Sequence, residues 1–254
     1  MRRRSRLVLA ALGLGLAGLL AGCGIQAAAP PAEQPTVSAP PLTAVSPDVP
    51  QAVRVRVRAT ATSSFGRRAR ELTVRVRNVS CEGVAIGSGF AISHDLLVTN
   101  RHVVAGAAVL EVSTWDGHSL DVSGAEVGVL GDLGVVVVKG RLPVVGSFGK
   151  PPLPGEPVTV AGYPLAGKLT LSQGTVIDRV DGRPFGIPGQ VLRLRARVEH
   201  GNSGGPVLDR YGKVVGVVYA IEVATGFGLA IPVDTLRSLA RTGGFEAVPP
   251  CGSG

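Results

Sequence analysis

Three residues of the types that cleave acyl bonds each stand beside an apolar run. His102 follows Leu96–Thr99 in LLVTNRHVV, Asp132 precedes Val135–Val138 in GDLGVVVV, and Ser203 lies in GNSGGP. A serine hydroxyl becomes a nucleophile when a histidine takes its proton, and a carboxylate fixes the tautomer of that histidine and stabilises its charged form. The three residues therefore predict nucleophilic attack on a carbonyl carbon.

Each of these signals has an ordinary structural explanation when taken alone. His102 could be a packed or surface residue after a strand, Asp132 could be a helix cap or turn residue, and GNSGG could be a turn. A glycine just before the serine also lets the backbone turn so that neighbouring N–H groups face a developing oxyanion. The combination, in the order His, Asp, Ser, carries the prediction.

The chain resembles the chymotrypsin-type serine proteases, and within them the bacterial HtrA-type and actinobacterial membrane-anchored periplasmic branches. The strings that carry this resemblance occur in order along residues 72–242: GSGFAIS, LLVTNRHVVAGA, GDLGVVVV, GNSGGPVLD, GKVVGVVYA and GFGLAIPVD. The resemblance implies an all-β fold of two antiparallel six-stranded β-barrels with the site between them.

Short apolar runs between Gly, Pro and Asp residues agree with that architecture. We expect strands at 83–93, 107–113, 133–139, 157–162, 169–180, 191–198, 206–208, 213–220 and 226–231. Asp234 can cap a short C-terminal helix over 235–241, which Gly243 and Gly244 would end.

The resemblance also implies a role for each site residue. Ser203 would be the nucleophile, His102 the general base and then acid, and Asp132 the orienting carboxylate. The backbone N–H groups of Gly201 and Ser203 would form the oxyanion hole. Substrate backbone would pair with the strand that carries Tyr219, Ala220 and Ile221, with Gly226–Gly228 opposite, and His200 would lie at the rim of the specificity pocket.

Two positions bear on activation and specificity. Asn202 stands where digestive relatives have an aspartate that pairs with a newly cut N-terminus, so we expect no activation through that salt bridge. Arg197 falls where the floor of the family's pocket lies, and pointing inward it would favour an acidic residue before the scissile bond. The alternation of Arg193, Arg195 and Arg197 instead favours an outward Arg197 on a wet strand face.

The N-terminal segment has the pattern of an export signal. Arg2, Arg3, Arg4 and Arg6 precede an apolar run of about 14 residues, shorter than the roughly 20 that span a bilayer. The run ends in Leu-Ala-Gly-Cys, which resembles the lipobox of bacterial lipoproteins, and that resemblance implies a lipid on Cys23. The alternative is an ordinary leader that happens to end near a cysteine.

Two segments of different composition follow the leader. Residues 24–51 are rich in Ala and Pro and show no strand or helix period, which predicts an extended tether. Between Arg54 and Arg77 there are eight arginines and only Glu71 as an acid. The alternation at 53–58 and 72–77 favours strands with one solvated face, and a patch facing anionic lipid or cell-wall polymers is the alternative.

With Cys23 lipidated, Cys81 and Cys251 remain near the two ends of the protease region. A disulfide between them is the expectation in an oxidising compartment, and some membrane-anchored relatives also link the ends of the domain. Two unpaired thiols are the alternative.

Composition narrows the classes of function that the chain could have. The 254 residues carry a net charge of +8, but four of the arginines lie in the leader and eight in the basic segment, so the protease region has no positive bias. Aromatic residues make up only 4%, which disfavours base-stacking modules, and we expect no nucleic-acid partner. His94 and His118 fit loops, no pair of histidines has metal-ligand spacing, and neither a metal nor another cofactor is expected.

These features predict four parts: a signal peptide at 1–22, a lipidated tether at 23–51, a basic segment at 52–80 and a trypsin-like protease domain at 81–254 without a C-terminal peptide-binding domain. We expect a serine endopeptidase that acts on proteins or peptides and is held by Cys23 on the outer face of the bacterial cytoplasmic membrane. A catalytically silent barrel protein that binds or scaffolds envelope components is the alternative. The sequence does not specify an oligomeric state.

Overall fold

The computed structural model describes residues 63–129, 131–249 and 251. The expectations for the signal peptide, the lipid on Cys23, the tether and a strand at 53–58 concern residues outside this described part.

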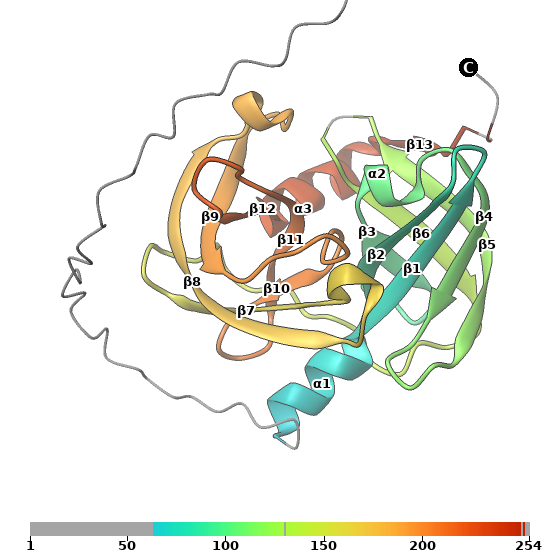
Figure 1. Ribbon diagram of the computed structural model, residues 1–254, viewed down its shortest axis with the longest axis horizontal. Helices are drawn as coiled ribbons and strands as arrows, with labels where there is room; N and C mark the ends of the chain where they lie inside the picture. Colours follow the sequence, from blue (N-terminus) through green and yellow to red (C-terminus); the bar gives the residue numbers. More distant parts are fainter. Residues whose placement is uncertain (1–62, 130, 250, 252–254) are drawn as a thin grey trace, which may run out of the picture. The chain divides into compact units, whose positions relative to one another are not determined.

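Six antiparallel strands close the first barrel, on the right of Figure 1. They are β1 (Thr73–Ser80), β2 (Val84–Ala91), β3 (Leu96–Thr99), β4 (Ala107–Ser113), β5 (Ser119–Gly128) and β6 (Gly134–Lys139). Pairing of β5 with β6 closes the barrel, and β13 (Phe245–Ala247) adds to β5 from the outside. Alternating buried residues such as Val74 and Val76 fill the interior, as the period of a half-buried strand requires.

Six further antiparallel strands close the second barrel, in the order β10-β11-β12-β9-β8-β7. They are β7 (Pro157–Gly162), β8 (Thr170–Asp181), β9 (Gln190–Ala196), β10 (Pro206–Leu208), β11 (Val214–Ile221) and β12 (Gly228–Pro232). A compact apolar cluster that includes Val160, Leu192, Leu194 and Val218 fills this barrel. The expected two-barrel, all-β fold is confirmed.

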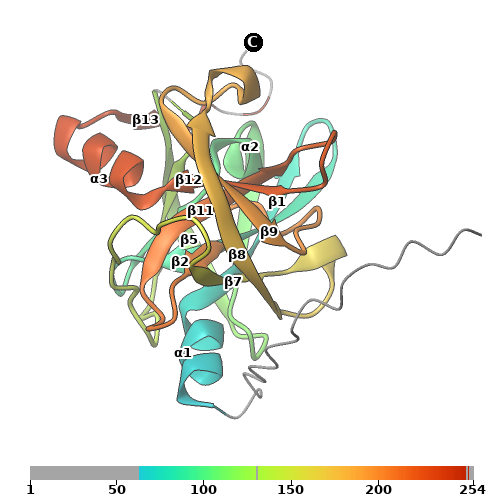
Figure 2. The same ribbon diagram turned by 90° about the vertical axis from the view of Figure 1, so that its left-hand side faces the viewer.

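Three α-helices accompany the barrels in the described part of the chain: α1 (Ser64–Leu72), α2 (Arg101–Val104) and α3 (Val233–Thr242). Short 3-10 turns occur at η1 (Pro164–Ala166) and η2 (Arg183–Phe185). Both views show α1 projecting from the start of β1, well away from α3 (Figures 1 and 2).

The proposed boundary at Cys81 requires correction, because the first barrel begins earlier. β1 lies between β2 and β4, so residues 73–80 belong to the barrel. The preceding basic stretch includes α1, whose buried face consists of Gly66, Ala69 and Leu72. The described arginines of this stretch, Arg67, Arg68, Arg70, Arg75 and Arg77, therefore lie on a helix and a barrel strand of the domain.

The C-terminal helix also differs from the expected one in its start. α3 begins at Val233 after Pro232, and Asp234 lies in its first turn. The Asp234 carboxylate accepts a hydrogen bond from Arg179 at 3.2 Å instead of capping the helix. Gly243 ends the helix in a left-handed conformation, as expected.

A disulfide joins Cys81, in the β1–β2 turn, to Cys251 beyond β13, with a Cα–Cα distance of 5.7 Å. The expected pairing is therefore present in the structure. No helix in the described residues has the length and apolar character needed to cross a membrane.

Candidate active site

His102 lies on α2, a single helical turn between β3 and β4. Buried Asn78 of β1 donates from Nδ2 to the carbonyls of Val103 (3.0 Å) and Ala105 (2.9 Å) at the end of this turn. These bonds satisfy carbonyls that a helix end leaves without partners. They fix the turn that carries His102 to the first barrel.

Asp132 receives two hydrogen bonds from His102. The ring Nδ1 lies 2.5 Å from Oδ2, and the backbone N–H donates to Oδ1 at 2.9 Å. Nδ1 acts as the donor because its partner is a carboxylate, which leaves Nε2 as the acceptor nitrogen. Asn100 Nδ2 donates to the Asp132 carbonyl at 2.7 Å and holds the aspartate's backbone in place.

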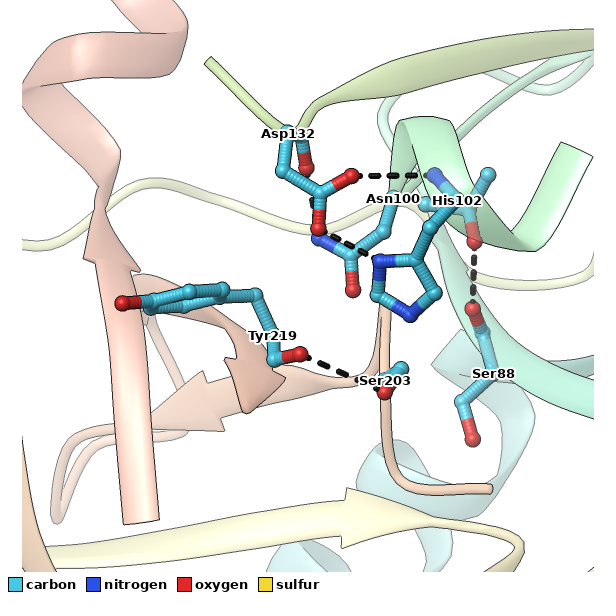
Figure 3. Close-up of polar contacts among 7 residues, drawn as sticks. Ser88, Asn100, His102, Asp132, Ser203 and Tyr219 are labelled. Atoms are coloured by element: carbon cyan, nitrogen blue, oxygen red, sulfur yellow. Dashed lines mark hydrogen bonds and ion pairs between the residues drawn. The ribbon is translucent and has the colours of Figure 1, made fainter. Parts of the chain in front are cut away.

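Ser203 lies on the other side of the His102 ring from Asp132, and the ring's second nitrogen faces it (Figure 3). Its Oγ donates to the carbonyl of Tyr219 over a long 3.5 Å. Catalytic hydrogen bonds are often long or poorly aligned before substrate binds, so this contact of the hydroxyl is compatible with a later bond to His102. The structure therefore brings His102, Asp132 and Ser203 together.

Residues Glu199–Gly205, here termed the nucleophile loop, present two unpaired amides. The N–H groups of Gly201 and Ser203 donate to no other group in the described part of the chain. Gly201 has φ +97°, and a Cβ there would lie 2.2 Å from the Tyr163 carbonyl oxygen, so the site requires glycine. Two free amides beside a serine hydroxyl are the donors that an oxyanion hole needs.

β11 carries the expected substrate-binding residues, with a bulge at Tyr219. The register to β12 shifts between Val218 and Ala220, and such bulges redirect side chains next to active sites. The Tyr219 side chain is buried and turned away from Ser203 in Figure 3, so only its backbone faces the serine. Burial raises the pKa of its hydroxyl, and nearby Asp132 and Glu222 raise it further. Ala220 and Ile221 are half-buried.

Arg197 points to solvent. Its side chain is 79% exposed and its guanidinium pairs with Glu199 at 2.7 Å, which is the outward orientation. The neighbouring Val198 points toward Gly228, where an added Cβ would lie 2.5 Å from its Cγ2. His200 is exposed, and its carbonyl accepts a hydrogen bond from Leu165 N at 2.6 Å.

Sequence reasoning missed three polar residues that hold the site: Asn78, Asn100 and Ser88. All three are buried, Asn78 and Ser88 within strands and Asn100 directly after β3, and that burial alone requires hydrogen-bond partners. Their partners are mostly backbone groups, which leave no pattern in the sequence. No group of three or more potential metal ligands occurs in the described residues.

A double barrel with a Ser-His-Asp arrangement defines the class of chymotrypsin-like hydrolases. The family model for the trypsin-like peptidase domain matches residues 87–217. The chain belongs to this trypsin-like peptidase family, as the sequence strings predicted.

Named relatives place the chain near HtrA-type proteases. It is 37% identical to the putative serine protease HhoB of Synechocystis over 61% of this chain and 39% of the relative. It is 34% identical to the serine protease HTRA1 of Xenopus laevis over 60% of this chain and 35% of the relative. The chain thus matches little more than a third of the length of these relatives.

The fold is also similar to that of the Rv3671c protease from M. tuberculosis in its active form. The TM-score is 0.66 with 28% sequence identity, covering 75% of this chain and 88% of the other. These matches agree with the resemblance of the sequence to trypsin-like proteases of the HtrA type.

Proposed function

We propose that this protein is a serine endopeptidase that hydrolyses peptide bonds through His102, Asp132 and Ser203. The observation that carries the proposal is the His102 ring, bonded through Nδ1 to Asp132 at 2.5 Å with its other nitrogen facing Ser203 beside two unpaired amides. Serine protease relatives within the same family support the same chemistry.

The reaction follows from these positions. Ser203 Oγ loses its proton to His102 Nε2 and bonds to the substrate's carbonyl carbon, whose oxygen becomes an anion that the Gly201 and Ser203 amides bind. His102 then gives the proton to the leaving amine, and the peptide bond breaks to leave an acyl-enzyme. A water molecule then attacks the carbonyl carbon of the acyl-enzyme while His102 takes its proton. His102 gives this proton to Ser203 Oγ as the ester bond breaks, and the product leaves with a new carboxyl group.

Asp132 stabilises the imidazolium that forms in each step. It holds both the ring and the backbone N–H of His102, so it also fixes the direction of Nε2. The carboxylate stays ionised throughout and takes no proton.

The nucleophile loop supports activity without a new N-terminus. Asn202 is buried, and its Oδ1 accepts a hydrogen bond from the Glu199 amide at 3.3 Å within the same loop. A neutral amide that is satisfied inside the loop needs no charged partner. We therefore propose that cleavage ahead of the barrel does not switch the enzyme on.

The substrate residue before the scissile bond is proposed to be apolar and not acidic. The contact between Val198 and Gly228 gives this region an apolar wall, whereas the charge of Arg197 is exposed and paired with Glu199. Digestion of a peptide library should show no enrichment for Asp or Glu at that position. Selective cleavage after acidic residues would contradict this assignment.

For the cellular setting we propose export and anchoring to the outer face of the cytoplasmic membrane through a lipid on Cys23. The support is the basic head, the short apolar run and the Leu-Ala-Gly-Cys sequence. Incorporation of a labelled fatty acid into the wild type but not into Cys23→Ser is the expected result. Equal incorporation into both would contradict the anchor.

A fluorophosphonate probe tests the activity directly, because it reacts with an activated serine. Wild-type protein should be labelled and should cleave peptides, Ser203→Ala should do neither, and Asp132→Asn should lose roughly 10⁴-fold in kcat. Absence of labelling in folded wild type, or equal labelling of Ser203→Ala, would favour a silent envelope-binding protein instead.

A further inference from the structure

Ser88 of β2 is a fully buried serine that lies next to the nucleophile loop but outside the proposed triad. Its Oγ donates to the Gly201 carbonyl at 2.6 Å and accepts a hydrogen bond from the Tyr163 amide at 3.0 Å. Its own amide donates to the Ser203 carbonyl at 2.7 Å. Thr99 Oγ1 in turn donates to the Ser88 carbonyl at 2.7 Å.

Through these contacts Ser88, which belongs to the first barrel, holds two carbonyls of the nucleophile loop. The Gly201 carbonyl belongs to the peptide directly after the first proposed oxyanion donor, and the Ser203 carbonyl to the peptide directly after the second. When a carbonyl is held, the rotation of its peptide plane is fixed. The free N–H of the same residue lies in the preceding peptide, so the held carbonyl restricts its direction through the φ and ψ of that one residue.

Packing around the loop leaves little room for another arrangement. A Cβ at Gly162 would lie 2.9 Å from Ser88 Oγ, and one at Gly204 would lie 2.1 Å from the Ser88 carbonyl oxygen. On the far side, the Tyr163 carbonyl fills the space next to Gly201. Ser88 Oγ is thus the polar atom that joins the first barrel, the start of the η1 turn and the nucleophile loop.

We propose that Ser88 is a positioning residue that sets the oxyanion hole. It touches neither substrate nor the transferred proton, and it acts through the Gly201 carbonyl. This inference rests on the proposed activity and on the assignment of the Gly201 and Ser203 amides as oxyanion donors.

Removal of the hydroxyl would leave two buried backbone groups without partners. The Gly201 carbonyl and the Tyr163 amide would each seek a new hydrogen bond. Gly201 has a positive φ and no side chain, so a change in its own φ and ψ is an available response. Such a change alters the angle between the Gly201 carbonyl and the Gly201 N–H, which is the first proposed oxyanion donor, and it leaves His102 and Asp132 in place.

The experiment compares Ser88→Ala with wild type in the full chain, using a peptide substrate. We expect kcat per active site to fall ten- to a hundred-fold while KM changes less than three-fold. A peptide boronate, which forms a tetrahedral adduct on Ser203, should lose affinity by a similar factor. The Kd of the same peptide, measured in a Ser203→Ala background, should be unchanged by Ser88→Ala.

A matched control separates positioning from stability. Thr73 is also fully buried, and its Oγ1 donates to the Ala69 carbonyl at 2.7 Å, at the end of α1 and away from the nucleophile loop. Thr73→Val should lower the midpoint of unfolding as Ser88→Ala does but leave kcat unchanged. Active-site titration corrects kcat for any unfolded fraction, and Ser88→Gly removes the same hydroxyl should Ser88→Ala not fold.

Equal kcat per titrated site in Ser88→Ala, Ser88→Gly and wild type would overturn the inference about Ser88. It would leave the proposed endopeptidase function intact. A rise in KM or in peptide Kd that accounts for the whole loss would also overturn it, because Ser88 would then shape substrate binding. A wild type that neither cleaves peptide nor binds the boronate defeats the proposed function itself.

Discussion

At the scale of single residues, Tyr163 and Tyr219 both contact the nucleophile loop through their backbone carbonyls and bury their side chains. Neither hydroxyl has a hydrogen-bond partner in the described part of the chain. The ring of Tyr163 instead contacts the Arg75 guanidinium, 4.7 Å from the ring centroid. Ring packing and cation–π attraction therefore hold this side chain, and its hydroxyl adds a desolvation cost.

Tyr163→Phe should preserve or slightly raise stability at neutral pH, by about 1 kcal/mol, because it removes an unpaired buried hydroxyl. The variant should also lose less stability in alkali. Burial raises the pKa of Tyr163 to about 12, so between pH 10 and 12 the unfolded chain releases a proton that the folded chain keeps, and stability falls as the pH rises. Urea unfolding at pH 8 and pH 11 measures both effects.

Tyr219→Phe serves as the comparison, because burial also raises the pKa of Tyr219. Each single variant should remove part of the alkaline loss and the double variant more than either. An alkaline loss in Tyr163→Phe as large as in wild type would contradict the burial argument.

The proposed catalytic residues could be predicted from the sequence because the chemistry dictates their types. Only a few side chains serve as nucleophile, base and orienting acid, so His102, Asp132 and Ser203 are recognisable by type and order. Ser88 could not be found in this way. Its hydroxyl partners are the backbone groups of Gly201, 113 residues away, and Tyr163, 75 residues away, and any residue type offers such groups.

At the scale of elements, the position of His102 depends on β1. α2 is a single turn, and a helix this short has little stability of its own. Asn78 gives it two hydrogen bonds from a strand that precedes it by more than 20 residues. The proposed general base is thus held by the barrel wall and not by its own helix.

Asn78→Ala should lower the free energy of unfolding by about 2 kcal/mol and reduce kcat, because two buried carbonyls lose their donors. Asn78→Asp should be worse than Asn78→Ala, since an ionised carboxylate of the same shape has acceptors only and would face the same carbonyls. Urea unfolding and peptide hydrolysis measure the two quantities. Wild-type activity in Asn78→Asp would show that the donors do not position His102.

The sequence pattern does not predict three elements, α1, β5 and β13, because their apolar patterns are weak. The buried face of α1 includes Gly66 and Ala69, which give little hydrophobic signal, and Ser63 caps the helix through a bond to Gly66 N. In β5 the register shifts between Val122 and Gly124, and this irregularity breaks the alternation that identifies a strand. β13 has only three residues and owes its form to pairing with β5. Tertiary contacts, not local preference, define these elements.

At the scale of the whole molecule, the chain returns to its first barrel at the end. After the second barrel and α3, β13 pairs with β5, and the disulfide then connects Cys251 to the β1–β2 turn. The two barrels also share a continuous core, in which Phe90 and Leu97 of the first barrel join Tyr219 and Ile231 of the second. Folding of one barrel is therefore coupled to the other.

Replacement of both Cys81 and Cys251 by serine should lower the free energy of unfolding by up to roughly 5 kcal/mol, since the closed loop spans 170 residues. Urea unfolding with and without a reductant is the measurement. The reductant should destabilise wild type toward the double variant and should have no effect on the double variant. Equal midpoints for oxidised wild type and the variant would show that the bond adds no stability.

The same bond determines what a single cut in the chain would do, which matters for a chain with proposed protease activity. Residues 81–251 form a covalent ring through the disulfide, so one cut in any exposed loop of that span opens the ring without releasing a piece. The nicked molecule keeps both barrels covalently linked through the Cys81–Cys251 bond. After self-cleavage or a cut by a neighbouring protease, a piece of the chain would be released only at a second cut or when a reductant opens the bond.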